Sequence, residues 1–548
     1  MDVTGGNFAA LLPWILYQIS CSCFVAIDLE FSGIAIVPTS KLSKDQSLQE
    51  RYLEVKAAAE RYQILQIGLT VCRENTTNAT YTMAPYNINL SPFVDRALDV
   101  NRDWTFMSWS MEFLMKHQFS MESLCKYGVR YLSREEEIQC MIIAHQRWSI
   151  TNAISEITVK ETDKETINFL GATRRVIDWW VAQSEDKRAD YLNIPSHVYP
   201  RSKAGTPLPR ILNNMEKRLV HQLVTAEYPK LKSRSRPMFV QIDFADPVKD
   251  KDANKAKANA LKTTIRRHVG FRWLIEALVG GDLSELPDET FSIFVMKNGS
   301  SPYGAADLAR IIRKRLQENR PVLIGHNCFM DLAFLYSGFI GPLPDDVEEF
   351  QKLIHGVLPN VVDTKYLATH DAGSINPASS LDEVARRLVN VSKPTILIDD
   401  QAVKYTVRKS SHEAGYDSML SAIIFMKLSV QLQKGQIQYC KSADLEGMKI
   451  CVAKEPSQIC QMEQQFKEEQ AKGIKAGTSA IEADLIEFSD DESSPPKRRS
   501  ALDESGSEEV AKKVQGGQLV PRLDSKFWRV YGNKLRVFGT TERIMNLS

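Results

Sequence analysis

Cysteine is scarce in this chain, with nine residues among 548. Only Cys21 and Cys23 lie close together, and no C-x-x-C pair is present. A zinc module and a disulfide framework both need paired or closely spaced cysteines, so the sequence argues against both. The odd number of cysteines agrees with a reducing, intracellular setting.

The chain has almost no net charge: it contains 69 Lys and Arg residues and 68 Asp and Glu residues, which gives a net charge of +1. A protein-wide basic surface for nucleic acid is therefore excluded, and any basic footprint must be local. The shares of hydrophobic (43%) and charged (25%) residues are typical of soluble globular proteins. The length predicts two to four domains.

Long hydrophobic runs are nearly absent. The most apolar stretch, residues 8–27, follows a segment that holds Asp2 but no Lys or Arg, so the basic start of a signal peptide is missing. Pro13 and the polar residues 18–20 divide this stretch into an expected helix, about 7–19, and a strand. We therefore expect neither secretion nor membrane association.

Two carboxylates follow the strand-like residues 24–27 at a spacing of two. In a β-strand residues i and i+2 point to the same face, so Asp28 and Glu30 are expected to converge. Adjacent like charges are costly unless they are protonated or bind a cation, and Mg²⁺ and Mn²⁺ prefer such oxygen ligands. The alternative is a strand that runs out into a solvated acidic turn.

Two further segments place polar residues at the ends of predicted elements. Residues 322–331 read as a short strand, a Gly-His-Asn break and a helix that carries Asp331. His412 and Asp417 open a periodic, helix-like segment, and their spacing lets both face one cleft. The chain thus offers four carboxylates and one imidazole at strand ends and helix starts.

In this order, D-x-E, N-x-x-x-D and H-x-x-x-x-D resemble the three motifs of the DEDDh group of 3′–5′ exonucleases. The chain also resembles the poly(A)-specific ribonuclease (deadenylase) family more closely, over about residues 1–160 and 265–435. The resemblance is carried by the start of the chain through FVAIDLEFSG and by the segments at 50–72, 128–137, 358–368 and 412–417.

A strand, a carboxylate-bearing turn and two further strands, 64–72 and 80–90, predict an α/β fold with a ribonuclease-H-like mixed β-sheet flanked by helices. We expect the nuclease domain to comprise 1–160, with the D-x-E motif, and 251–435, with the other two motifs. Residues 161–250 are expected to form a small nested α/β insert. Residues 436–548 are expected to form a C-terminal tail.

In the family, the insert is an RNA-binding domain with an Arg-x-x-x-His signature, and here Lys217 and His221 occupy the matching positions, so the motif is degenerate. Four basic residues within 230–236 offer phosphate contacts, although a solvated turn is the alternative.

The acidic, Ser-rich tail is expected to be disordered over about 470–520, around a weak nuclear-import patch at 497–499. Residues 527–539 predict strands around a Gly-Asn turn that dock onto a folded domain. No RNA-recognition-motif signature is evident in the tail, in contrast to many members of the family.

The resemblance implies a role for each motif residue. Asp28 would bridge two Mg²⁺ ions, for which Mn²⁺ can substitute, Glu30 and Asp417 would complete one site, and Asp331 would help to hold the other. His412 fits a general base, with a structural histidine as the alternative. Three residues are expected to contact the substrate: Phe31, Ile34 and Lys365. For Phe31 and Ile34, a role in core packing is an equally good explanation. Asp363 would support the pocket.

The chain is thus expected to be a metal-dependent 3′–5′ exoribonuclease that acts on single-stranded RNA ends, with poly(A) implied by the resemblance alone. Trimming of small noncoding RNAs by the same chemistry, a catalytically silent RNA-binding adaptor and a proofreading DNA exonuclease are the alternatives. The resemblance also implies a homodimer located in nucleus and cytoplasm.

Overall fold

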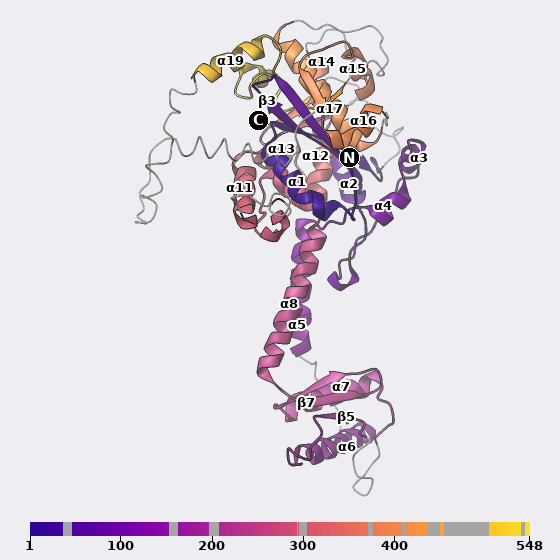
Figure 1. Cartoon of the computed structure of the whole chain (residues 1–548). Helices are drawn as coiled ribbons and strands as arrows, with labels where there is room; N and C mark the ends of the chain where they lie inside the picture. Colours follow the sequence, from indigo (N-terminus) through magenta and orange to yellow (C-terminus); the bar gives the residue numbers. More distant parts are fainter. Residues whose placement is uncertain are drawn as a thin grey trace, which may run out of the picture. The chain divides into compact units, whose positions relative to one another are not determined.

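The computed structural model (Figure 1) describes residues 1–36, 46–152, 163–196, 208–292, 294, 304–370, 376–407, 412–435, 450–453, 504–538 and 543–547. The chain forms two compact units, one made of Met1–Ile138 with Arg266–Ser548 and the other of Gln139–Ile265. The predicted insert, 161–250, falls within the second unit.

The strands are β1 (Asp2–Val3), β2 (Phe24–Phe31), β3 (Ile64–Asn75), β4 (Thr80–Asn89), β5 (Tyr191–Ile194), β6 (Leu231–Ser235), β7 (Val240–Phe244), β8 (Val322–Gly325), β9 (Val361–Asp363), β10 (Thr395–Ile398), β11 (Cys451–Val452), β12 (Lys534–Arg536) and β13 (Ile544–Asn546). The α-helices are α1 (Phe8–Ser20), α2 (Leu48–Arg61), α3 (Ser108–Lys116), α4 (Met121–Tyr127), α5 (Arg134–Asn152), α6 (Lys164–Val181), α7 (Asn214–Glu227), α8 (Pro247–Val269), α9 (Arg272–Val279), α11 (Ala305–Glu318), α12 (Phe329–Leu335), α13 (Val347–Val357), α14 (Thr364–Thr369), α15 (Leu381–Arg387), α16 (Lys404–Val407), α17 (Ala414–Gln433), α19 (Glu504–Gln515) and α20 (Lys526–Tyr531).

The central sheet of the first unit is mixed, with the order β11-β10-β4-β3-β2-β8-β9, and β1 pairs with β4. β2, β3 and β4 form antiparallel pairs, whereas β8 runs parallel to both β2 and β9. Residues 24–27 of β2 and 64–72 of β3 are all buried, so side chains on both faces of these strands are covered. The predicted α/β fold with a helix-flanked mixed sheet is confirmed.

Helix α17 lies in the core of this unit, and it packs against β2, β3 and β4 (Figure 1). Its residues 414–431 are all buried, which explains why its sequence is apolar on every side rather than along one stripe. Helices α14 and α15 also contact α17. The helix that carries Asp417 is therefore held from several directions.

The C-terminal region corrects two predictions. Disorder was expected through residue 520, but residues 504–515 form α19, and Val510 and Val514, spaced i and i+4, pack against the core that contains the buried Leu519. Residues 527–531 were expected to form a strand, but they form α20. Phe527, Trp528 and Tyr531 have helical spacing and face that core, where Trp528 stacks on Phe425 at 5.4 Å between ring centroids.

Residues 527–539 were also expected to dock onto a folded domain. For residues 527–538, which the structure describes, the contacts of Phe527, Trp528 and Tyr531 with the core confirm this prediction. The remainder of the predicted disordered stretch, from 470 to 503, and the basic patch at 497–499 lie outside the described residues. Of the helices that the structure describes, none combines the length and apolarity that a membrane crossing requires.

The second unit contains the three-stranded antiparallel sheet β5-β7-β6 and helices α6 and α7. His221 on α7 lies over β6, where its ring nitrogens are 2.7 Å from the hydroxyls of Ser233 and Ser235. Two of the four basic residues within 230–236 lie on β6: Lys232 is paired with Asp250, and Arg234 lies 3.3 Å from Asp243. Part of the positive charge predicted for RNA is thus compensated within the unit.

Candidate active site

The D-x-E carboxylates lie within strand β2, which continues to Phe31 instead of ending before them. The parallel pairing with β8 stops at Ala26 and Ile324, whereas the antiparallel pairing with β3 continues past both acids. Asp28 and Glu30 therefore lie on one face of β2, just beyond the end of its parallel neighbour. Both side chains are half-buried at this edge of the sheet.

Asp331 reaches the same edge from the helix that follows β8. The turn between them contains Asn327 in the left-handed conformation (φ 57°), and helix α12 then starts at Phe329. The Asp331 carboxylate accepts a hydrogen bond of 3.1 Å from the backbone N–H of Leu29, the residue between the two β2 acids. This bond ties the second motif directly to the first.

Side chains from the sheet hold the start of α17. The N–H groups of Ala414 and Gly415 donate to the side-chain oxygens of Gln66 and Asn87, at 2.9 and 3.1 Å. Gly68 permits this approach, because a Cβ there would lie 1.7 Å from the carbonyl oxygen of Ala414. The third motif is thus fixed against β3 and β4.

His412 and Asp417 are linked within their motif, because the Asp417 carboxylate accepts a 3.0 Å hydrogen bond from the backbone N–H of His412. His412 has a left-handed backbone (φ 66°), which non-glycine residues adopt rarely and often at functional sites. Asp417 is in the first turn of α17, where the helix dipole favours a negative charge.

The three motifs converge in space. The ligand atoms of Glu30, His412 and Asp417 all lie within 4.8 Å of one another. Burial, followed by repulsion from Asp417, Glu30 and Asp331, raises the pKa of Asp28 well above its usual range. Burial and the charges of Asp417 and Asp331 likewise raise the pKa of Glu30. The four acids therefore repel one another across one small volume.

The other two acids are affected in the same direction. Burial raises the pKa of Asp331 and of Asp417 to about 7 in each case. A divalent cation would offset this concentration of negative charge, and the donor set of carboxylate oxygens with an adjacent imidazole suits a hard cation such as Mg²⁺ or Mn²⁺. The residues present therefore fit the predicted metal site.

These raised pKa values predict that, without metal, the protein becomes less stable as pH rises. The folded state binds more protons at these acids than the unfolded state, so their stabilising contribution is present below a pH of about 4 and is lost as pH rises through about 7. We expect the melting temperature in EDTA to fall between about pH 5 and pH 8, and millimolar Mg²⁺ to restore it by binding the native site.

Thermal melts at several pH values, with EDTA or with Mg²⁺, measure this effect. Asp28→Asn removes one of the repelling charges, so its melting temperature in EDTA should depend less on pH than that of the wild type. If Mg²⁺ and Mn²⁺ leave the wild-type melting temperature unchanged at every pH, the four acids do not form a metal site.

The ring of His412 contacts two other rings: that of Phe113 on helix α3 and that of His117, the residue that follows α3. Its ring centroid is 4.7 Å from that of Phe113 and 4.2 Å from that of His117. Burial and then the neighbouring His117 lower the pKa of His412, so the imidazole is neutral at physiological pH and is able to accept a proton. A role for Phe113 and His117 at the site was not predicted. The available signal in the sequence was the pair of aromatic residues in the 108–116 segment.

The predicted substrate residues have different environments. Phe31 packs on Phe334, with ring centroids 4.1 Å apart, whereas Ile34 is 36% exposed. Lys365 is only 7% exposed, and burial lowers the pKa of its ammonium group. A direct substrate contact by these residues stays a prediction.

The supporting residues lie beneath the motif turns. Asp363 is fully buried at the end of β9, where it accepts hydrogen bonds from the backbone N–H groups of Asn327 and Lys365 at 2.7 and 2.9 Å. His326, in the turn after β8, has its Nδ1 2.9 Å from the hydroxyl of Thr364, and burial lowers its pKa to about 3.

Proteins of similar sequence include ribonucleases. An uncharacterized protein of Schizosaccharomyces pombe is 25% identical over 80% of this chain and 95% of its own length. The poly(A)-specific ribonuclease PARN of Arabidopsis thaliana is 24% identical over 77% of this chain, which spans 62% of that protein. The pre-piRNA 3′-exonuclease trimmer of Bombyx mori is 24% identical over 78% of this chain and 71% of its own length.

Among solved structures, the Mg²⁺- and Mn²⁺-bound form of S. pombe Pop2p aligns with a TM-score of 0.33 at 13% identity, over 78% of this chain and 91% of that one. The model of the CAF1 family ribonucleases matches residues 3–425, which include all three acidic motifs and strands β2, β3, β4, β8, β9 and β10 of the central sheet. The chain therefore belongs to the CAF1 ribonuclease family.

Proposed function

We propose that the protein is a divalent-metal-dependent exoribonuclease that removes nucleotides from the 3′ end of single-stranded RNA. The observation that carries this proposal is the convergence of four carboxylates and one imidazole, from three separate chain segments, at one edge of the sheet. Asp28, Glu30, Asp331 and Asp417 would hold two Mg²⁺ ions, and Mn²⁺ would be able to replace them.

The metal ions, when bound, would help to activate the attacking water and would offset charge on the attacking and leaving oxygens. The protein supplies the geometry and the base. His412 takes the proton of the attacking water at an imidazole nitrogen, because its lowered pKa keeps the ring neutral. Phe113, which is 41% exposed and lies beside His412, offers an aromatic face to a nucleotide base at the reacting end.

Poly(A) is the proposed substrate, since several relatives are poly(A)-specific ribonucleases. Trimming of small noncoding RNAs is the second candidate, favoured by the comparable identity to the silkworm trimmer. We further propose that the protein acts in nucleus and cytoplasm and forms a homodimer, as the family resemblance implies.

Digestion of labelled oligonucleotides tests the proposed function and separates it from its alternatives. We expect A-tailed RNA to be shortened from its 3′ end only with Mg²⁺ or Mn²⁺, faster than U-tailed RNA and much faster than DNA. Equal rates on A-tailed and U-tailed RNA would favour general 3′ trimming. Faster digestion of DNA would contradict the assignment to RNA, and binding without any digestion would indicate an adaptor.

A further inference from the structure

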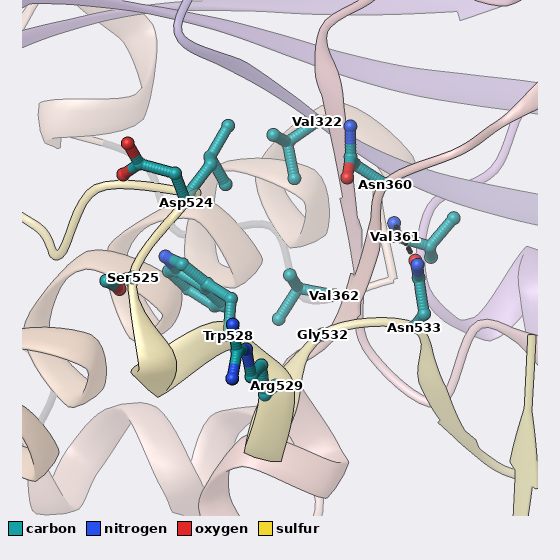
Figure 2. Close-up of a pocket in the computed structure, with 11 residues that line it drawn as sticks. Val322, Asn360, Val361, Val362, Asp524, Ser525, Trp528, Arg529, Gly532 and Asn533 are labelled. Carbon is teal, nitrogen blue, oxygen red and sulfur yellow. Dashed lines mark hydrogen bonds between the residues drawn. The ribbon is translucent and has the colours of Figure 1, made fainter. Parts of the chain in front are cut away.

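The C-terminal residues 526–537 and 543–547, here called the C-terminal clasp, comprise α20, β12 and β13 and lie against the strands that lead to the active site. Trp528 of α20 lines a cavity of about 280 Å³ together with Val322 of β8 and Val362 of β9 (Figure 2). The clasp thus contacts β8 and β9 near their amino-terminal ends.

Asn533 pairs the clasp with β9, the edge strand of the central sheet. Its side-chain oxygen accepts the N–H of Val361 at 2.9 Å, and its own N–H donates to the carbonyl of Val361 at 2.7 Å (Figure 2 draws the side-chain bond). Its side-chain amide also donates to the carbonyl of Pro359 at 2.9 Å. These bonds pair backbone groups on the outer edge of β9, as an added strand would.

Further along the clasp, Arg536 reaches the buried carboxylate of Asp363 at the opposite end of β9. Its backbone N–H donates to Oδ2 of Asp363 at 2.9 Å, while Oδ1 accepts the N–H groups of Asn327 and Lys365. A fully buried carboxylate needs such donors on both oxygens, because an unsatisfied charged oxygen is costly. The clasp provides a donor to Oδ2.

Asp363 in turn holds the turn that positions Asp331. Asn327, whose N–H it accepts, has a left-handed backbone and lies four residues before Asp331. Asp331 then bonds the N–H of Leu29 between the two β2 acids. A short series of hydrogen bonds therefore leads from Arg536 to the acidic cluster.

The side chain of Arg536 fixes the clasp in this position. Arg536 is 2% exposed, and its Nε donates to the hydroxyl of Thr369 on α14 at 3.0 Å. Its guanidinium group also lies over the ring of Tyr366, 6.0 Å from the centroid. A buried arginine with these partners holds β12 against α14 and β9.

We propose that the C-terminal clasp is a positioning element of the metal site, and that Arg536 acts through Asp363 to hold Asp331 in place for cation binding. This inference rests on the proposed function. Outer-shell partners of metal ligands commonly change metal affinity by about ten- to a hundredfold when they are removed. The clasp lies more than a hundred residues beyond the last acidic motif, so it would couple the C-terminal region to the catalytic centre.

Binding of Mn²⁺ to the full-length protein in the absence of RNA, measured by electron paramagnetic resonance or calorimetry, tests the inference. Arg536→Pro removes both the N–H and the guanidinium group and should weaken Mn²⁺ binding by about tenfold. Arg536→Ala keeps the N–H and should weaken it by about threefold. Arg529→Ala, an exposed change on α20, is the matched control and should bind Mn²⁺ as the wild type does.

Thr369→Val serves as a second variant if Arg536→Pro fails to fold, because it removes the acceptor of the guanidinium group at nearly constant volume. It should weaken Mn²⁺ binding about as much as Arg536→Ala. Wild-type affinity in every folded variant of Arg536 and Thr369 would overturn the inference. Failure of the wild type itself to bind Mn²⁺ would instead overturn the proposed function, so the two failures are distinguishable.

Discussion

Replacing Asp28 by Asn is expected to lower the rate of RNA hydrolysis at saturating Mg²⁺ by about a thousandfold or more while the protein stays folded. Asp28 is the acid whose pKa responds to all three other motif carboxylates, so it lies among them. Loss of one metal ligand removes several kcal/mol of transition-state stabilisation, roughly 4 kcal/mol for a thousandfold effect. Single-turnover digestion of A-tailed RNA measures the rate.

The same loss is expected for Glu30→Gln, Asp331→Asn and Asp417→Asn. Asp399→Asn is a suitable control, because Asp399 is also a buried acid with a raised pKa, but it caps residues 400–402 instead of belonging to the motifs. Its rate should stay within about twofold of the wild type. Any motif variant that is folded and retains a tenth of the wild-type rate would remove that residue from the proposed metal site.

His412→Ala is expected to lower turnover by about a hundredfold or more and to leave Mn²⁺ binding nearly intact, as for the loss of a general base. The base must be neutral to accept a proton, so the wild-type rate should fall at acidic pH. Because burial and His117 lower the pKa of His412, this fall should come below the ordinary imidazole value of about 6.5.

The pH dependence of single-turnover rates provides the check. His412→Ala should flatten the acid side of the profile as well as reduce the maximum. A variant with wild-type turnover and an unchanged profile would make His412 a structural residue, and hydrolysis would then depend on the metal ions alone.

The acidic motifs could be predicted because each depends on local spacing. The i and i+2 positions in a strand place Asp28 and Glu30 on one face, and the run before them is apolar enough to read as a buried strand. The sequence alone does not show how far β2 continues, because its length depends on pairing with β3, and β3 begins only after another helix.

The supports of the motifs could not be predicted, because they join distant parts of the chain. Gln66 and Asn87 hold the start of α17 more than three hundred residues away, and no local pattern marks an amide side chain for that role. The helix α20 was mistaken for a strand because its four apolar and aromatic residues are too few to distinguish a period of two from one of 3.6. Burial of Trp528 against Phe425 decides the conformation.

The most direct test of the central claim is the identity of the products formed from a 5′-labelled, A-tailed RNA with a free 3′-hydroxyl. We predict that the wild type shortens the RNA one nucleotide at a time and releases 5′-AMP, only when Mg²⁺ or Mn²⁺ is present, and that Asp28→Asn does neither. Undiminished cleavage in EDTA, or no cleavage by folded wild-type protein that binds both metal and RNA, would contradict a metal-dependent hydrolytic centre at these residues.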